Sequence, residues 1–464
     1  MLLRKLYTPL TIVGLLATFA YSEYVVKPHY HDHKIHIVYW EKWTGGEGDA
    51  IKQTVNYFNH SQNKIHVDLL TISDIQDKTL LSVAGGDPPD VAGLYGADVA
   101  QYADDRAVID LDPYLRKYGI KKSQYIPVYW KMNNIRGKEY ALPSTPASTA
   151  LFYNRALFKA AGMDPDKPRD WHHGHYTIEE MDKDAARLTK FAPNGQLQIM
   201  GFLPAEPGWW EWGWGYFFGG KLWNGSNKIT ANDAGNIKAY QWIASFSKKY
   251  GANNVSAFHS GLGQFSSSQN GFMAGKVAME IQGVWFYHYI AMYAPNMLAN
   301  PKTGKQAEWG IAPFPYPADR PDRAGTTFAD EDVLVIPRGA KHPNSAFKFI
   351  DFMESPKGMD MLCGLQWKMS PLIHNEPGFY RNNRNRTARF FAEQAESKNV
   401  INVPRTGIYP EYADALQNAY DAVSLLDQTP KQALDVVQRQ IQRQLNEYIQ
   451  HEKMRLAAEG KSHK

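Results

Sequence analysis

The sequence predicts an α/β protein built from two lobes, and three observations support that fold class. The chain has 464 residues, of which 44% are hydrophobic, so it is too long for one comfortable core and has enough apolar side chains for two. Short strand-like segments alternate with segments in which apolar residues recur at helical spacing. Two proline-rich, extended segments interrupt this alternation and indicate connections between lobes.

The first lobe is predicted from its alternating elements. Apolar patterning predicts strands over residues 34–40, 65–69 and 90–94, and helical stretches around 51–58, 74–84 and 99–106. The helix over 74–84 ends at Gly85 and Gly86, because glycine readily adopts the left-handed conformation of a helix C-terminus. This alternation is typical of βαβ units and predicts a mainly parallel sheet.

Two crossings divide the rest of the chain. Prolines favour extended backbone over residues 141–152 and 311–317, which we predict to be the crossings. The predicted boundaries are 34–145 with 312–360 for the first lobe, and 146–311 with 361–455 for the helix-rich second lobe. A strand over 333–336, a helix over 344–354 and an amphipathic helix over 434–449 follow the second crossing.

The N-terminal segment has the layout of an export signal. Arg4 and Lys5 precede an apolar run from Leu6 to Ala20, so we assign residues 1–28 to a signal peptide or, if uncleaved, to an N-terminal membrane anchor. No cysteine directly follows this run, which excludes lipid attachment through an N-terminal cysteine. We therefore expect a periplasmic or otherwise extracytoplasmic protein.

The composition excludes several classes of partner and cofactor. The formal net charge of +4 is too small over this length to indicate nucleic acid. Cys363 is the sole cysteine, so an intramolecular disulfide and a cysteine-based metal cluster are excluded. We expect no cofactor and no metal, and we interpret two histidine-rich stretches as solvated segments: His29, His31, His33 and His36, and His172, His173 and His175.

Six motifs in a fixed order resemble the family 1 extracellular solute-binding proteins, which include maltose-type binding proteins of ABC importers. They are GGDPPDV at 85–91, GKEYALP at 137–143, LFYNRALFKAAGMD at 151–164, FMAGKVAMEIQGVW at 272–285, WGIAPFP at 309–315 and LVIPRGAKHPNSAFKFIDFM at 334–353. The resemblance runs from about Lys34 to the end of the chain. It implies a periplasmic-binding-protein fold of the class II type with a ligand cleft between the lobes. It also implies that the protein presents its captured solute to membrane permease subunits. We expect a monomer and a carbohydrate solute, and the 13 tryptophans favour an oligosaccharide over a monosaccharide.

Candidate site residues follow the strand ends, where open α/β sheets bind ligands. A sugar presents apolar C–H faces and polar edges, so its receptor needs flat rings together with carboxylates. Trp40, Glu41 and Trp43 follow the first predicted strand, and Tyr95 follows the third. For Trp40 and Trp43 the alternative is packing in the core.

Further candidates come from loops. Asp87 lies in a Gly-Pro turn, where it either meets ligand hydroxyls or caps local backbone. The remaining candidates are Trp210 and Trp212, from a run of seven aromatic residues over 209–218, together with Trp285, Glu331 and Trp367. The resemblance implies a ligand-facing ring at Trp285. Glu331 belongs either to a solvated acidic run or to the ligand site, and Trp367 either packs or closes over the ligand.

Two other functions stay open at this point. Glu41, Asp87 and Glu331 supply carboxylates of the kind that a secreted glycoside hydrolase uses, although no catalytic framework is recognisable. A binding protein for a solute other than a sugar is the second alternative. We expect a binding protein and not an enzyme, because the six motifs cover the chain.

Overall fold

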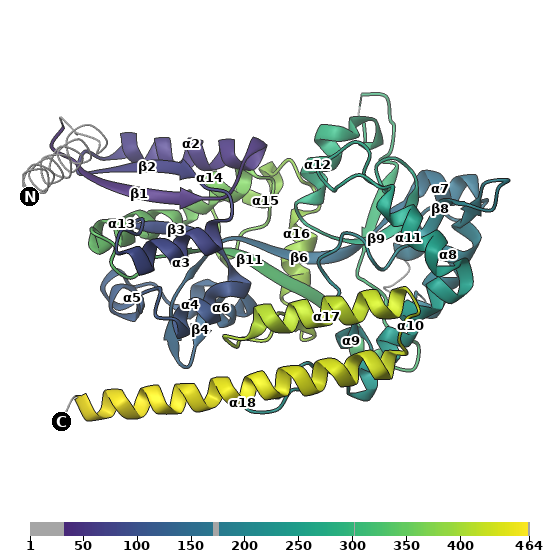
Figure 1. Ribbon diagram of the computed structural model, residues 1–464. Coiled ribbons are helices and arrows are strands. Elements are labelled where there is room, and N and C mark those ends of the chain that lie inside the picture. Colours follow the sequence, from purple (N-terminus) through teal and green to yellow (C-terminus); the bar gives the residue numbers. More distant parts are fainter. Residues whose placement is uncertain (1–31, 170–175, 301, 463–464) are drawn as a thin grey trace, which may run out of the picture.

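The computed structural model describes residues 32–169, 176–300 and 302–462, and these form two lobes joined by long strands (Figure 1). In the first lobe, strands alternate with helices in the order β1 (Ile35–Glu41), α2 (Gly45–Ser61), β2 (Ile65–Thr71), α3 (Ile75–Gly85) and β3 (Val91–Tyr95). Strand β1 pairs in parallel with both β2 and β3, which confirms the predicted βαβ arrangement. Helix α3 ends at Gly85 and is capped by Gly86, whose φ of 78° is left-handed as expected.

Short helices and a hairpin complete the first lobe. They are α4 (Val99–Asp104), α5 (Asp112–Tyr118), α6 (Pro127–Asn133), β4 (Asn134–Ile135), β5 (Lys138–Glu139), α13 (Pro343–Met353) and α14 (Pro356–Leu365).

Two long strands carry the sheet from one lobe into the other (Figure 1). Strand β6 (Leu142–Asn154) is buried along its whole length and pairs antiparallel with β11 (Thr327–Val335), β9 (Val277–Gly283) and β10 (Trp309–Ala312). The strand order is β2-β1-β3-β11-β6-β9-β8-β7, which ends with β8 (Leu197–Phe202) and β7 (Lys190–Phe191). A continuous hydrogen-bonded ladder therefore connects the first lobe to the second.

The second lobe combines short strands with many helices. Its elements are α7 (Arg155–Ala160), α8 (Ile178–Leu188), β7 (Lys190–Phe191), β8 (Leu197–Phe202), α9 (Trp214–Phe217), α10 (Ala234–Tyr250), α11 (Ala252–Ser260), α12 (Phe286–Tyr293), α16 (Ala388–Ala395), β12 (Val400–Ile401), α17 (Tyr409–Ser424) and α18 (Pro430–Ser462). The short helix α15 (Phe379–Asn382) lies between α14 and α16 in the sequence.

Separate hydrophobic cores support the two lobes. Cys363 packs with Leu334 and Phe347 in the main core of the first lobe, although it follows the predicted boundary at 360. Ala312 and Phe314, from the segment predicted as the second crossing, pack in the core of the second lobe. Strand β11 then carries the chain back to the first lobe. The lobe boundaries themselves remain a prediction.

Helix α18 spans both lobes. Its apolar face lies in the core of the second lobe through Leu434, Val437, Ile441 and Leu445, as the amphipathic pattern predicts. The helix then continues beneath the first lobe (Figure 1), where Tyr448 donates a hydrogen bond to Asp104 of α4.

No helix in the described part of the chain combines the length and the apolar character needed to cross a membrane. The predicted signal peptide or anchor over residues 1–28 lies outside the described residues.

Candidate functional site: an aromatic and acidic cavity between the lobes

A cavity of about 800 Å³ opens between the lobes at the carboxyl ends of β1 and β3. The first lobe lines it with the loop after β1, the turn after β3 and the middle of β11; the second lobe contributes the loop before α9, the end of β9 and helices α12 and α17. The carboxyl ends of parallel strands lie at the same edge of a sheet. The loop after β1 and the turn after β3 therefore meet at this cavity although they are far apart in the sequence.

Lys42 anchors the side of the cavity formed by the first lobe. Its ammonium lies 2.8 Å from Asp332 and 3.3 Å from Glu41. Burial opposes the charge on Lys42, but the carboxylates of Asp332 and Glu41 outweigh this effect and raise its pKa. Lys42 is therefore a fixed positive charge that is already neutralised by protein carboxylates.

A second lysine holds the ring of Trp43. The ammonium of Lys368 lies 3.8 Å from the centre of that ring, within range of a cation–π interaction. It also pairs with Glu47 at 2.7 Å. The other oxygen of Glu47 accepts a hydrogen bond from the hydroxyl of Tyr289 on α12, at 3.1 Å. Glu47 thereby links the first lobe to α12 across the cavity.

Four tryptophans line the side of the cavity formed by the second lobe. Trp285 lies with its ring centre 5.7 Å from that of Trp209 and 6.4 Å from that of Trp210, and Trp212 lies nearby in the same loop. Trp210 also stacks on Phe328 at 4.8 Å, which fixes its ring against the core. The buried indole N–H groups of Trp210 and Trp285 have no hydrogen-bond partner among the described residues. These rings offer both flat apolar faces and unpaired donors.

Carboxylates line the floor of the cavity along β11. Burial and the neighbouring Asp332 raise the pKa of Asp330 to about 7. Burial and the neighbouring Asp330 raise the pKa of Glu331 well above its ordinary value. Glu331 accepts a hydrogen bond from Asn133 at 3.0 Å, and its second oxygen has no hydrogen-bond partner within the described residues. Burial likewise raises the pKa of Asp98 to about 6.

Six of the ten predicted site residues line this cavity: Trp43, Tyr95, Trp210, Trp212, Trp285 and Glu331. Glu331 was expected either in a solvated acidic run or in the ligand site. It is 2% exposed, so it does not belong to a solvated run. Trp210 and Trp212 each line the cavity with part of the side chain and pack in the core of the second lobe with the rest.

The other four predicted residues do not line the cavity. Trp40 is half-buried and packs against a core of the first lobe, which was its alternative reading. Glu41 points into the protein, where it accepts a 2.6 Å hydrogen bond from Tyr39. Asp87 is exposed and pairs with Lys341 at 2.6 Å. Trp367 packs on His288, with ring centres 4.3 Å apart.

These positions bear on the hydrolase alternative. Of Glu41, Asp87 and Glu331, the structure brings only Glu331 to the cavity. The pair of carboxylates that glycosidic cleavage needs is therefore not formed by the residues proposed for it.

Sequence reasoning missed several lining residues, among them Lys42, Glu47, Trp209, Asp330, Lys368 and Tyr289. Trp209 belongs to the aromatic run already singled out, and Asp330 to the acidic run, so composition pointed to both segments. Lys368 and Tyr289 carried no signal of their own, because their place at the cavity depends on packing of α12 and of the loop after α14.

Residues 42–360 match the model of the bacterial extracellular solute-binding protein family. The chain belongs to this family. The solute-binding protein is 22% identical over 408 residues to the arabinooligosaccharide-binding protein of Bacillus subtilis (strain 168), which covers 83% of this chain and 86% of the relative. It is 20% identical over 434 residues to the sn-glycerol-3-phosphate-binding periplasmic protein UgpB of Escherichia coli (strain K12), covering 86% and 90%.

Solved structures share the fold. CpMnBP1 with mannotriose bound superposes on the solute-binding protein with a TM-score of 0.73 at 27% identity, covering 88% of this chain and 99% of that one. The sugar-binding protein MalE from Xanthomonas citri gives a TM-score of 0.70 at 18% identity, covering 90% and 99%, and supports the fold alone. The predicted two-lobed periplasmic-binding-protein fold is confirmed.

Proposed function

We propose that this solute-binding protein captures a carbohydrate, with room for several sugar rings, and delivers it uncleaved to the permease subunits of an ABC importer. The observation that carries the proposal is the pairing of four tryptophans on one side of the cavity with carboxylates on the other. Sugar rings stack their C–H faces on indoles, while their hydroxyls donate hydrogen bonds to carboxylates.

The volume and the charge of the cavity narrow the solute class. A cavity of about 800 Å³ lies in the range that holds a drug-sized ligand, which favours an oligosaccharide over a monosaccharide. Both lysines of the cavity already pair with carboxylates, Lys42 with Asp332 and Lys368 with Glu47. A phosphate group would have to compete with those carboxylates, so a neutral sugar fits better than a sugar phosphate. The mannotriose held by CpMnBP1 supports the same class.

The ligand-binding residues proposed within this function are Trp43, Tyr95, Trp210, Trp212, Trp285 and Glu331. We further propose that the protein is exported, acts outside the cytoplasm as a monomer and does no chemistry on its solute.

Isothermal titration calorimetry tests the proposal with mannobiose, mannotriose, arabinooligosaccharides, glucose, maltose and sn-glycerol 3-phosphate. We expect micromolar or tighter binding of at least one neutral oligosaccharide, which chromatography recovers intact after prolonged incubation. Trp285→Ala should weaken binding at least about 30-fold, because a buried anchoring ring contributes about 2 kcal/mol or more.

Trp223→Ala is the matched control, because Trp223 packs at the edge of the second core and its indole bonds to the backbone of Ser226, away from the cavity. Its affinity should equal that of the wild type. Binding of glycerol phosphate alone, cleavage of the sugar, or equal loss in both variants would contradict the proposal.

A further inference from the structure

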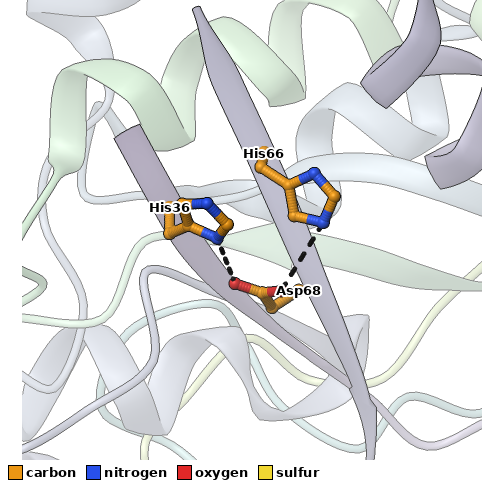
Figure 2. Close-up of side chains that lie close together, drawn as sticks. All are labelled: His36, His66 and Asp68. Carbon is orange, nitrogen blue, oxygen red and sulfur yellow. Dashed lines mark hydrogen bonds and ion pairs between the residues drawn. The ribbon is translucent and has the colours of Figure 1, made fainter. Parts of the chain in front are cut away.

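A cluster of metal-ligating side chains lies at the end of the first lobe remote from the cavity. His36 stands on β1, directly across from His66 on the neighbouring parallel strand β2, and Asp68 follows two residues later on β2. Side chains two residues apart on a strand point to the same face of the sheet, so the three side chains share one face (Figure 2). The opposite face of the same strands, with Ile37 and Val67, lies in the core of the first lobe.

This placement corrects one expectation drawn from the sequence. His36 was expected to lie in a solvated histidine-rich segment, but its side chain is only 11% exposed because the strand pairing brings it against β2. Of the other histidines in the two stretches, His29, His31, His172, His173 and His175 lie outside the described residues.

The donor atoms have the spacing of a metal site. His36 Nδ1 lies 3.0 Å from one oxygen of Asp68, and His66 Nε2 lies 3.6 Å from the other. One ligand atom from each of the three residues lies within 4.8 Å of the others. Ligands held tetrahedrally about 2.1 Å from a Zn²⁺ ion are separated from one another by about 3.4 Å. A small inward movement of three partly exposed side chains therefore completes the coordination.

Asp32 supplies the supporting contact that metal-bound histidines use. His36 Nε2 lies 2.9 Å from Asp32 Oδ1, on the side of the ring away from Asp68. A neutral imidazole carries one N–H, and with a cation bound, donation of that N–H to Asp32 would leave the lone pair of Nδ1 directed at the cation. A carboxylate that accepts from the outer ring nitrogen fixes the tautomer and the orientation of a metal-bound histidine.

The geometry points to a binding site for one divalent transition-metal ion such as Zn²⁺, held by His36, His66 and Asp68 and supported by Asp32. The two imidazoles are borderline ligands that favour Zn²⁺ over Mg²⁺ or Ca²⁺, and a single carboxylate beside them is a common third ligand of Zn²⁺. His66 and Asp68 are about a third exposed, which leaves a fourth position open to water.

The site is separate from the cavity. His36 lies near the amino end of β1 and Lys42 just beyond its carboxyl end, about 20 Å away along an extended strand. Bound metal would join the edge strand β2 to β1 and to the chain segment that precedes β1. It would stabilise the first lobe without touching the solute.

Zinc titration of the full-length, tag-free and chelator-treated protein tests the site by calorimetry and thermal unfolding. We expect one Zn²⁺ per chain and a raised melting temperature, with no comparable effect of Mg²⁺ or Ca²⁺. His66→Gln and Asp68→Asn should each weaken Zn²⁺ binding at least 10-fold, and the circular dichroism spectrum and the affinity for the cavity solute should stay unchanged.

The triple variant His29→Gln, His31→Gln, His33→Gln is the matched control, because these histidines precede His36 in the sequence and are not among the proposed ligands. It should bind Zn²⁺ as the wild type does. The inference fails if the wild type does not bind Zn²⁺ below about 1 mM, or if the triple variant loses binding that His66→Gln and Asp68→Asn retain. None of these outcomes depends on whether the cavity binds sugar.

Discussion

The ammonium of Lys368 lies 2.7 Å from the carboxylate of Glu47, and both side chains are largely buried at the wall of the cavity. Removing one member of such a pair strands the other charge in a poorly solvated place and destabilises a protein by about 3 kcal/mol. We therefore expect Lys368→Met to lower the free energy of unfolding by roughly that amount, as urea denaturation measures it. The double variant Lys368→Met, Glu47→Gln should recover part of the loss. Strictly additive losses would show that the two charges are not coupled.

Tyr289 connects α12 to the first lobe through its hydrogen bond to Glu47. Removing a hydrogen bond to a charged group costs about 1.5–3 kcal/mol, so Tyr289→Phe should weaken the contact between the lobes and lower solute affinity roughly 10-fold or more. Small-angle scattering of the ligand-free protein should show a larger radius of gyration in the variant. Tyr293→Phe, on the same helix and more exposed, is the control and should match the wild type. Identical scattering from Tyr289→Phe and the wild type would contradict the prediction.

Asp330 should make stability depend on pH. Its pKa is about 7 in the folded protein, above the ordinary value of 3.8, so the unfolded chain releases the proton first. The contribution of Asp330 to the free energy of unfolding therefore falls as pH rises from about 4 to about 7. Asp330→Asn removes this loss, because the amide stays neutral and its oxygen still accepts from the Glu331 N–H.

Differential scanning calorimetry at pH 5 and pH 8 checks this dependence. We expect the melting temperature of Asp330→Asn, relative to wild type, to be higher at pH 8 than at pH 5 by about 2 °C or more. Asp49→Asn, at an exposed position on α2, should show no such change with pH. A difference for Asp330→Asn that is the same at both pH values would contradict the assignment.

Asp104 holds the far end of α18 against the first lobe. Its carboxylate pairs with Arg136 and accepts from Tyr448, so Asp104→Ala removes the acceptor of the Tyr448 hydroxyl and one of the two carboxylates that pair with Arg136, the other being Glu452. The variant should be less stable by about 2–4 kcal/mol. Hydrogen exchange should rise in α18 around Tyr448 and stay slow around Leu434, which the second core covers. Asp435→Ala, near the start of the same helix, is the control and should leave exchange around Tyr448 unchanged.

The fold was largely accessible from the sequence because its signals are local. The strand at 34–40 and the helix over 74–84 were predicted to within a residue or two of β1 and α3, since apolar spacing and a terminal glycine act over a few residues. The packing of residues 311–317 could not be predicted from local patterns. Their prolines exclude a helix, yet Ala312 and Phe314 pack into the second core, and this depends on β10 pairing with β6.

The types of residue at the site could be predicted from the sequence, but the particular residues that line the cavity could not. The sequence alone determined that tryptophans and carboxylates follow the strand ends, because both types recur just after apolar runs. Tertiary structure decided which of them face the cavity. Side chains two residues apart on a strand share a face, so Glu41 turns inward to Tyr39 on β1, whereas Glu331 on β11 lines the cavity with an unpaired oxygen. Lys368, Tyr289 and the facing pair His36 and His66 come together only when separate segments pack, and no spacing along one segment encodes those contacts.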